Sequence, residues 1–449
     1  MGLSGIEIFK KLPKTNCGKC GVPTCLAFAM KLATGQAEIE ACPDISEEVK
    51  EEIGEASAPP VRTVIIGAGE RAVKIGGEAF MFRHEKRFEN PPVFTLFLSD
   101  KMDEETVSDR LTRFNNAVYE RVGVVMRPEL IAIKGDSGES SRFEALAAKV
   151  CRETDAGFVL MNEDTEALSR TVRACSGRKP LIYAATGNNL ETLGNLALEF
   201  SCPLAVKGNN LEELAGFAER LVGMGLKDLV LDSGARTAGK VLEDQIIIRR
   251  SALMKRFKPF GFPTIVFPCE MTDDPMKEAM IACQMMTKYG SIIVLSGIEG
   301  HSIFPLLLAS MNIFTDPQRP MTVEEKIYEI GAVDENSPVI ITGNFSLTYF
   351  IVSGEIDSSR VPVYLLIKDT EGLSVLTAWA AGKFGADTIG VFIKKSGIED
   401  RIKHRKLVIP GYLSSISGEL EEELPGWKVL VGPREASHLP AYLKQLSQQ

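Results

Sequence analysis

From residue 93 to about residue 300, short apolar runs alternate with longer stretches whose apolar positions recur every three or four residues. The apolar runs are almost unbroken, which is typical of parallel strands buried on both faces. The longer stretches, such as NNLETLGNLALEF and DEETVSDRLTRFNNAVYERV, have the period of amphipathic helices. Eight strands are predicted, at residues 93–98, 130–134, 158–162, 181–186, 204–208, 229–233, 264–270 and 292–297.

This alternation predicts an α/β fold. Eight strand–helix repeats within about 230 residues fit a (β/α)₈ TIM-type barrel, which we expect over residues 58–318. An open, doubly wound sheet is the alternative, because it has the same alternation. Ahead of the first repeat, the runs VRTVIIGAG and AVKIGGE predict a hairpin that covers the barrel as a lid.

Residues 319–449 continue the alternation on a smaller scale. Five strand–helix units in about 110 residues predict a small flavodoxin- or Rossmann-like domain. Its strands are expected at residues 338–342, 362–368, 388–394, 406–410 and 428–432. Its helices are expected at residues 346–355, 372–384, 396–404, 412–422 and 437–447.

Residues 1–57 have a different character, because four of the nine cysteines lie there. The acidic run DISEEVKEEIGE that follows them predicts a helix, with Asp44 or Ser46 as its N-cap. The linker ASAPPVR comes next, and its two prolines mark a domain boundary. We therefore expect three domains: a small cysteine-containing module, a barrel and a C-terminal α/β domain.

Composition narrows the class of protein. The 449 residues are 45% hydrophobic and 25% charged, which is the balance of a soluble globular protein. The net charge of −9 gives nucleic-acid binding no electrostatic support. No apolar run reaches the roughly 18 residues that span a bilayer. The N-terminal sequence MGLSGIEIFKKLP has no apolar signal core, so we expect a cytoplasmic protein.

The four N-terminal cysteines have the spacing of an iron–sulfur site. Cys17, Cys20, Cys25 and Cys42 form the pattern C-x₂-C-x₄-C-x₁₆-C, and Pro43 follows the last one, as it does at many such sites. Gly18 and Gly21 let the backbone bend around a cluster. We predict that the four cysteines bind a [4Fe–4S] cluster. Zinc is the alternative, although its usual closing pair of nearby ligands is missing.

The other five cysteines are scattered singly among apolar neighbours: Cys151, Cys175, Cys202, Cys269 and Cys283. A chain of 49 kDa builds a large core and needs no disulfides to fold. We therefore interpret each of these five as a small buried hydrophobic residue.

The loops after the C-terminal strands predict a ligand site. In an open α/β sheet, ligands bind beyond the carboxyl ends of the strands, where helix N-termini offer free N–H groups. Here these segments are TGNFS, DTEGLS, PGYLS and GPREA, which are small and polar. Turns and helix caps use the same residue types, so the loops alone leave the ligand open. The chain contains no Walker A sequence, no G-x-G-x-x-G and no D-x-H-x-x-G.

Polar residues also stand at the ends of several barrel strands, where many barrels carry their catalytic groups. They are Asp100, Lys134, Asn162, Lys207, Asp232 and Glu270. Such residues also cap helices and form ion pairs. We see no nucleophile–base pair and no metal-ligand cluster among them, so we assign no catalytic residue to this chain.

With these elements in place, the chain resembles the large (gamma) subunit of the corrinoid iron–sulfur protein of the acetyl-CoA (reductive one-carbon) pathway. The resemblance covers essentially the whole chain, and its most specific motif is TNCGKCGVPTC. DTEGLSVLTAWAAGKF and TGNFSLT look like the corrinoid-contacting stretches of that family. The resemblance implies a heterodimer with a barrel-shaped small subunit, with the corrinoid between that barrel and the C-terminal domain of this chain.

The resemblance also implies the function of a methyl carrier, a component of a corrinoid-dependent methyltransferase system. Cobalt(I) accepts a methyl group from methyltetrahydrofolate through a separate methyltransferase and donates it to acetyl-CoA synthase. The [4Fe–4S] cluster restores cobalt that has been oxidised to cobalt(II). The corrinoid is of the cobalamin type and is bound base-off, without a protein histidine below cobalt, which agrees with the missing D-x-H-x-x-G.

By matching stretches, the resemblance implies a set of corrinoid contacts in the C-terminal domain. They are Thr342, Gly343, Asn344, Ser346, Thr370, Glu371, Gly372, Leu373, Ser374, Thr377, Gly411, Leu413, Gly432 and Ala436. Two other classes stay open at this point. One is an electron carrier with FMN on the C-terminal domain, and the other is a scaffold with structural zinc.

Overall fold

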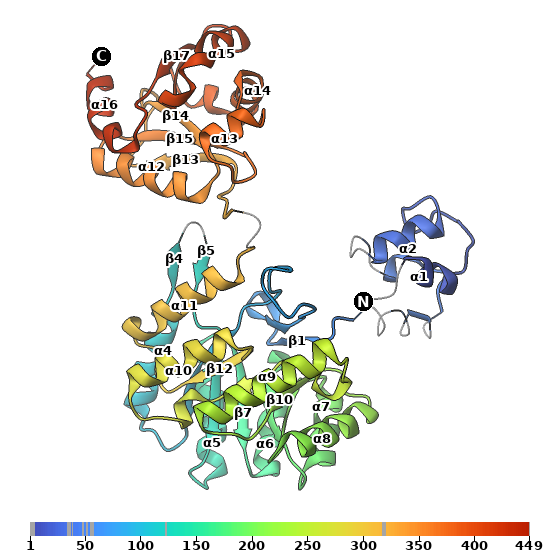
Figure 1. Cartoon of the computed structure of the whole chain (residues 1–449). Helices are drawn as coiled ribbons and strands as arrows, with labels where there is room; N and C mark the ends of the chain where they lie inside the picture. Colours follow the sequence, from blue (N-terminus) through green and yellow to red (C-terminus); the bar gives the residue numbers. More distant parts are fainter. Residues whose placement is uncertain are drawn as a thin grey trace. The chain divides into compact units, whose positions relative to one another are not determined.

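The computed structural model describes residues 5–33, 37, 39–46, 49–50, 53, 58–121, 124–316 and 320–448. It divides into two compact units (Figure 1). One comprises Met1–Tyr119 and Met126–Phe314, and the other comprises Glu120–Val125 and Thr315–Gln449. The predicted boundary at residue 57, the acidic helix over 44–55 and the linker lie partly outside the described residues. No described helix is long and apolar enough to cross a membrane.

The N-terminal module is built around two short helices, α1 (Gly5–Lys11) and α2 (Cys25–Ala33), with the 3₁₀ turn η1 (Ile39–Ala41). The helices pack so closely that a β-carbon on Gly5 would overlap the sulfur of Met30. Ile8, Phe28 and Ala29 are almost fully buried between them. This small core of its own holds the loops that carry the cysteines.

The central part is an eight-stranded parallel barrel, and this prediction is confirmed. Its strands follow the order β10-β9-β8-β7-β6-β3-β12-β11. A parallel bridge between Leu231 and Thr264, with a hydrogen bond of 2.8 Å from Leu231 N to Pro263 O, joins the two ends of the sheet. The strands are β3 (Val93–Ser99), β6 (Leu130–Gly135), β7 (Gly157–Asn162), β8 (Leu181–Ala185), β9 (Leu204–Lys207), β10 (Leu229–Asp232), β11 (Ile265–Val266) and β12 (Ile292–Leu295).

Helices surround the barrel, as Figure 1 shows. Side-chain N-caps at Asp103, Asp164, Asn210 and Asp274 accept hydrogen bonds from the first turns of four of them. Their apolar faces pack on the outside of the strands in one large core. The helices are α4 (Glu104–Asn116), α5 (Ser140–Glu153), α6 (Thr165–Cys175), α7 (Leu190–Phe200), α8 (Leu211–Gly223), α9 (Ala238–Met254), α10 (Pro275–Thr287) and α11 (Gly300–Phe314).

The predicted hairpin consists of β1 (Thr63–Ile66) and β2 (Val73–Gly76), which pair antiparallel. Its backbone bonds to segments that precede barrel strands, from Gly67 N to Lys179 O at 3.0 Å and from Arg62 N to Gly261 O at 2.9 Å. Val64, Ile66 and Ile75 belong to the apolar interior of the barrel. The hairpin therefore closes the amino end of the barrel and leaves the carboxyl end to the loops.

Two details of the barrel differ from the prediction. The helical pattern over residues 103–122 ends at Asn116, and the chain continues into a separate two-stranded sheet of β4 (Tyr119–Arg121) and β5 (Val124–Met126). The strand predicted at 264–270 has only two residues, because Pro268 lacks the N–H that a ladder needs and begins the turn η5 (Pro268–Glu270).

The C-terminal unit contains a five-stranded sheet in the order β13-β15-β14-β16-β17. The last four are parallel and take the second-first-third-fourth order of a doubly wound sheet, with a switch point between β14 and β16. The strands are β13 (Lys326–Ile330), β14 (Val339–Gly343), β15 (Val363–Lys368), β16 (Lys406–Ile409) and β17 (Lys428–Val431).

The strand predicted at 388–394 is wrong, because these residues lie in helix α14 (Ala386–Ser396). Thr388 Oγ1 accepts a hydrogen bond from Gly385 N at the start, and Gly397, with φ of 73°, ends the helix. The buried residues, among them Ile389 and Ile393, follow a helical period. The fifth strand is β13, which was not predicted; it pairs antiparallel at the sheet edge.

The other C-terminal helices lie close to the predicted ones but differ in length. The helix predicted at 396–404 is only the turn η6 (Ile398–Asp400), and the one at 372–384 is shortened to α13 (Val375–Ala380). The remaining elements are α12 (Ser346–Ser359), η7 (Gly411–Ile416), α15 (Ser417–Glu423), η8 (Ala436–His438) and α16 (Leu439–Leu446).

Candidate functional site

Asn16 links the loop of the first two cysteines to Cys25 at the start of the helix that follows. Asn16 Oδ1 accepts a hydrogen bond of 2.8 Å from Cys25 N, and Asn16 N donates to Cys25 Sγ at 3.4 Å. Cys25 is buried at the start of α2, and Cys20 is half-buried beside it. Asn16 therefore fixes the loop of the first two cysteines against the helix that carries the third, and an N–H already points at a sulfur.

The fourth cysteine approaches the first through its neighbour Asp44. Cys42 is buried, and Lys19 donates to Asp44 Oδ1 at 3.1 Å. The pKa of Asp44 lies below its ordinary value because Lys19 and then the Cys17 thiol donate hydrogen bonds to it. The segment after Cys42 is thus linked to the loop between Cys17 and Cys20.

The donor set of this module suits an iron–sulfur cluster. Four thiols with adjacent N–H donors are the groups that hold and tune such clusters. Among the described residues, no three His, Cys, Asp or Glu side chains lie close enough to bind one metal ion. The assignment of Cys17, Cys20, Cys25 and Cys42 as cluster ligands therefore stays a prediction from their spacing.

The loops after β14, β15, β16 and β17 come together at the carboxyl edge of the C-terminal sheet, which we call the C-terminal edge. It comprises residues 344–346, 369–374, 410–414 and 432–436. Because the four strands are parallel neighbours, their loops emerge on the same side. All fourteen predicted contacts lie on these loops, at the strand ends that precede them or on α13, so the structure brings them to one edge.

Asn344 organises the first two loops of the C-terminal edge. It is 4% exposed, and its Oδ1 accepts hydrogen bonds of 3.0 Å from Thr370 N, Thr370 Oγ1 and Gly372 N. Its Nδ2 donates to Asp369 Oδ1 at 2.8 Å. The side chain of Asn344 therefore holds the loop over 369–374 in place from below.

The third and fourth loops touch through Gly411. A β-carbon on Gly411 would lie 2.6 Å from Gly432 O and 2.8 Å from Arg434 N, which are backbone atoms and cannot move aside. Gly411 N also donates to Pro433 O at 3.1 Å. Only glycine at this position lets the two loops approach this closely.

Several predicted contacts are buried. Thr370 and Leu413 are 0% exposed, and Thr342 and Ser346 are nearly so. Their side chains shape the C-terminal edge from beneath it. The structure adds four residues that the sequence reasoning missed, each between 44% and 56% exposed: Leu347, Leu376, Trp379 and Tyr412. Large apolar side chains on the helices that directly follow glycine-rich loops could have indicated these residues from the sequence.

At the carboxyl end of the barrel, charged side chains bind one another. Arg236 donates to both carboxylate oxygens of Asp232, at 2.9 and 3.1 Å, and to Glu270 Oε2 at 2.5 Å. Tyr183 donates to Asp232 Oδ2 at 2.5 Å. Burial, and next the Asp232 carboxylate, raise the pKa of Tyr183 well above its ordinary value, so the phenol keeps its proton. Lys134 lies 3.5 Å from Glu270 Oε1.

Two more strand-end residues, Asp100 and Asn162, form hydrogen bonds to the loops that follow their strands. Asp100 accepts hydrogen bonds from Asp136 N, Ser137 N and Ser137 Oγ, at 2.7 to 3.0 Å. Burial raises its pKa, but these hydrogen bonds outweigh burial and leave the pKa of Asp100 below its ordinary value. Asn162 accepts from Asp164 N at 2.9 Å. Both residues order the loops that follow their strands.

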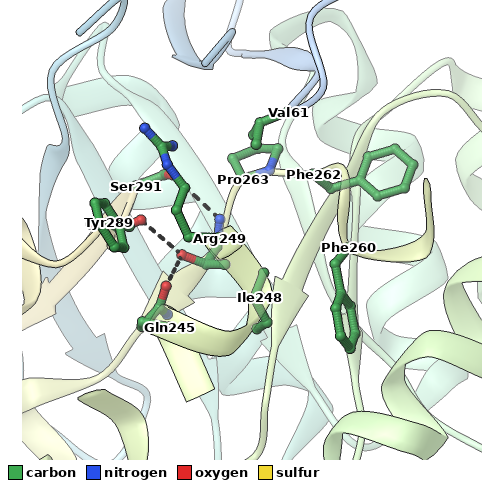
Figure 2. Close-up of a pocket in the computed structure, with 10 residues that line it drawn as sticks. Val61, Gln245, Ile248, Arg249, Phe260, Phe262, Pro263, Tyr289 and Ser291 are labelled. Atoms are coloured by element: carbon green, nitrogen blue, oxygen red, sulfur yellow. Dashed lines mark hydrogen bonds between the residues drawn. The ribbon is translucent and has the colours of Figure 1, made fainter. Parts of the chain in front are cut away.

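A small pocket lies at the amino end of the barrel, between α9 and the segments before β11 and β12 (Figure 2). Thr264 Oγ1 donates to Gln245 Oε1 at 2.9 Å, and Thr264 N donates to Ser291 Oγ at 3.3 Å. Arg249 lies over the Tyr289 ring, 4.9 Å from its centroid. The pocket has room for at most about one water molecule, so it belongs to the packing of the barrel.

Fold and sites together define a class of protein: a parallel barrel combined with a cysteine module and a doubly wound domain with a glycine-rich carboxyl edge. Residues 63–443 match the family described as CO dehydrogenase/acetyl-CoA synthase delta subunit, and residues 12–43 match the family described as "Putative Fe-S cluster". The second match includes all four predicted cluster cysteines, so it lies within the N-terminal module.

Curated relatives match over the full length. The chain is 45% identical to the corrinoid/iron-sulfur protein large subunit of Moorella thermoacetica, over 99% of both chains. It is 35% identical to the acetyl-CoA decarbonylase/synthase complex subunit gamma of Methanothermobacter thermautotrophicus, over 100% of both, and 35% identical to that of Methanopyrus kandleri, over 99% and 98%. The chain therefore belongs to the CO dehydrogenase/acetyl-CoA synthase subunit family, together with these large and gamma subunits.

Proposed function

We propose that this chain is the methyl-carrying subunit of a corrinoid iron–sulfur protein in the acetyl-CoA pathway, with a corrinoid on its C-terminal domain and a [4Fe–4S] cluster on its N-terminal module. The observation that carries the proposal is the full-length similarity to a relative named for both cofactors. In this role the chain is one component of a methyltransferase system, and its own residues bind and position the cofactors.

The C-terminal edge would hold the corrinoid in a Rossmann-like, corrinoid-binding domain. When bound, the corrinoid supplies a cobalt ion that receives and releases the methyl group. The close approach at Gly411 and Gly432 provides a flat backbone surface, and the loop held by Asn344 presents Glu371, Gly372 and Ser374. Trp379 and its apolar neighbours would cover the edge of a macrocycle and exclude water from it.

The proposed base-off binding mode requires that no histidine of the chain binds cobalt. His404 Nε2 lies 2.9 Å from Ser337 O, and its Nδ1 accepts from Lys406 N at 3.2 Å, so both ring nitrogens are already engaged. His438 ends η8, two residues after the predicted contact Ala436. We propose that His438 does not bind cobalt, so that cobalt has no protein nitrogen ligand. His438→Ala should therefore leave the visible spectrum of the bound corrinoid unchanged. A spectral shift would contradict the base-off binding mode.

The cysteine module would hold the cluster, which supplies single electrons that restore oxidised cobalt. Asn16 positions Cys25, and the pair of Lys19 and Asp44 positions the segment after Cys42. The N–H of Asn16 directed at Cys25 Sγ would stabilise negative charge on the ligating sulfur.

The proposed partners are a barrel-shaped small subunit in a heterodimer, a methyltetrahydrofolate methyltransferase and acetyl-CoA synthase. The methyltransferase and acetyl-CoA synthase must both reach the same methyl group, so the corrinoid has to be exposed on at least one face. The apolar side chains around the C-terminal edge are the surface on which we expect the small subunit to cover the corrinoid.

The proposal is tested by a visible spectrum and metal analysis of the anaerobically purified heterodimer. Corrinoid bands with one cobalt and about four irons support it. Flavin bands would support an electron carrier instead, and zinc alone a structural scaffold.

The role of the cluster needs a second test. Cys20→Ala should lose iron and keep cobalt, and methyl transfer should remain intact when cobalt is chemically reduced beforehand. Without that reduction, activity should decline over successive turnovers. Loss of transfer even from pre-reduced protein would contradict a purely reactivating role.

A further inference from the structure

Two cysteines on the outside of the barrel lie next to each other. Cys151 is in the last turn of α5, and Cys175 is the last residue of α6. Their sulfur atoms are 3.4 Å apart, although 24 residues separate them in the chain. A disulfide bond is about 2.05 Å long, so the sulfurs would need to approach by only about 1.4 Å.

The surroundings of the pair differ for the two thiols. Cys175 is 7% exposed, whereas Cys151 is only half-buried and can be reached from solvent. Arg178 is fixed beside them, because its guanidinium donates to Thr154 O at 3.2 Å and to Ala156 O at 2.7 Å, and its Nη1 lies 3.4 Å from Cys151 O. A fixed positive charge beside an accessible thiol favours the thiolate.

The pKa values agree with this geometry. The hydrogen bond from Cys175 lowers the pKa of Cys151 to about 7, against burial, and Arg178 and Arg152 add to the effect. The hydrogen bond to Cys151 and burial raise the pKa of Cys175. Cys151 is thus the nucleophile of the pair, and Cys175 is the neighbouring thiol that keeps its proton. Neither residue belongs to the cofactor sites proposed above.

We propose that Cys151 and Cys175 form a redox-active dithiol that hydroperoxides oxidise to a reversible disulfide. The Cys151 thiolate attacks the peroxide O–O bond, which breaks to give a sulfenic acid on Cys151 and release hydroxide. The Cys175 sulfur then attacks the sulfenic sulfur, and water leaves with the Cys175 proton. The hydroxide takes up the proton that Cys151 released to solvent. In total, the two thiols lose two electrons and two protons, and hydrogen peroxide is reduced to two molecules of water.

The test uses the full-length protein in its heterodimer, treated anaerobically with a small excess of hydrogen peroxide, alkylated and digested with trypsin. The pair falls in two short peptides, Val150–Arg152 and Ala174–Arg178. We expect them to be recovered joined by a disulfide, with the joined form lost after dithiothreitol. Recovery of both peptides singly, alkylated or with Cys151 oxidised to sulfonic acid, would overturn the proposal.

Two variants separate the roles of the thiols. In Cys175→Ser, Cys151 should accumulate as sulfenic acid that dimedone traps, because the resolving thiol is missing. Cys283→Ser, at another half-buried cysteine, should leave the joined peptides unchanged. Trapping of Cys283 to the same extent as Cys151 would show non-selective oxidation and contradict the proposal.

A measurement on the unmodified protein does not depend on the variants folding. At pH 7, a thiol with a pKa of about 7 is thiolate about 50 times more often than one at the ordinary value of 9.0. We therefore expect iodoacetamide to alkylate Cys151 at least tenfold faster than Cys202, whose pKa burial raises to about 11. Equal rates would overturn the assignment of Cys151 as the nucleophile.

Discussion

At the carboxyl end of the barrel, the charged side chains bind one another, whereas at the C-terminal edge the loops present glycines, backbone amides and short side chains. Asp232, Arg236 and Glu270 use their charges on each other. The side chain of Asn344, in contrast, holds a loop from below and leaves the outer face of that loop to a ligand. Both edges have polar residues at parallel strand ends, so position alone does not define a binding site. A strand end can bind a ligand only where its polar groups are not already bonded to one another.

The comparison can be tested because the two units have separate signals. Both tryptophans of the chain, Trp379 and Trp427, lie in the C-terminal unit, so tryptophan fluorescence follows that unit. Far-UV circular dichroism is dominated by the larger barrel unit. Corrinoid content, measured as cobalt per chain, reports the C-terminal edge.

The largest effect on corrinoid content is expected at Gly411. In Gly411→Ala, the new methyl group would overlap backbone atoms of the fourth loop and force the two loops apart. We expect corrinoid content to fall at least about tenfold, which corresponds to about 1.4 kcal/mol or more of binding free energy. Gly418→Ala is the matched control, since nothing lies within 4 Å of the added carbon there. Full cobalt content in Gly411→Ala would place the corrinoid elsewhere.

Arg236→Met tests the barrel side of the comparison. The change leaves the carboxylate of Asp232, which is 2% exposed, without its cation, and leaves Glu270 with only Lys134. We therefore expect the barrel to lose about 3 kcal/mol of unfolding free energy. Circular dichroism in urea measures this loss, and cobalt content should not change. Arg220→Met, in an exposed ion pair, should cost less than about 0.5 kcal/mol. A fall in cobalt content for Arg236→Met would give the barrel a role in binding.

Asn344→Ala should loosen the C-terminal edge. The N–H groups of Thr370 and Gly372 would lose their acceptor, which costs about 2 kcal/mol in the stability of the C-terminal unit. Tryptophan fluorescence in urea measures this cost, and corrinoid binding should weaken with it. The exposed Asn336→Ala serves as the control. Unchanged stability would mean that the side chain of Asn344 does not support the loop.

The stability of the barrel should also depend on pH, through Glu129 at its amino end. Glu129 Oε2 accepts from Phe94 N at 3.3 Å, and burial raises the pKa of Glu129 from 4.5 to about 8. Between these pH values the folded protein holds a proton that the unfolded chain has released. The stability of the barrel should therefore fall as pH rises from about 5 to 8, by up to about 1.4 kcal/mol per unit.

Glu129→Gln should remove this slope, as measured by urea titrations at several pH values, while the exposed Glu105→Gln should keep it. Corrinoid content should stay constant over the same range in both variants. An identical slope in Glu129→Gln and the wild type would assign the pH dependence to another group.

The sequence predicted the barrel well because each buried strand is a nearly unbroken apolar run. It failed where two periods compete, as in TIGVFIK, whose β-branched residues favour a strand although Gly385 and Gly397 bound a helix. β13 was missed because this edge strand, whose residues are all exposed or half-buried, has no such run. The positions of the loops could be predicted from the ends of the strands, and with them the C-terminal edge. The burial of Thr370 and Leu413 on these loops could not be predicted.

The cysteine contacts, too, could be predicted from the sequence only in part. The spacing of the first four could be interpreted because local geometry brings close neighbours together. The contact of Cys151 with Cys175 depends on how α5 packs against α6, and nothing in the sequence around either residue indicates it.

The most direct test of the account is the iron and cobalt content of two variants of the anaerobically purified heterodimer. We predict that Cys20→Ala loses iron and retains cobalt, and that Gly411→Ala loses cobalt and retains iron. Loss of both metals in both variants, or retention of cobalt in Gly411→Ala, would contradict the assignment of two separate cofactor sites to the two ends of this chain.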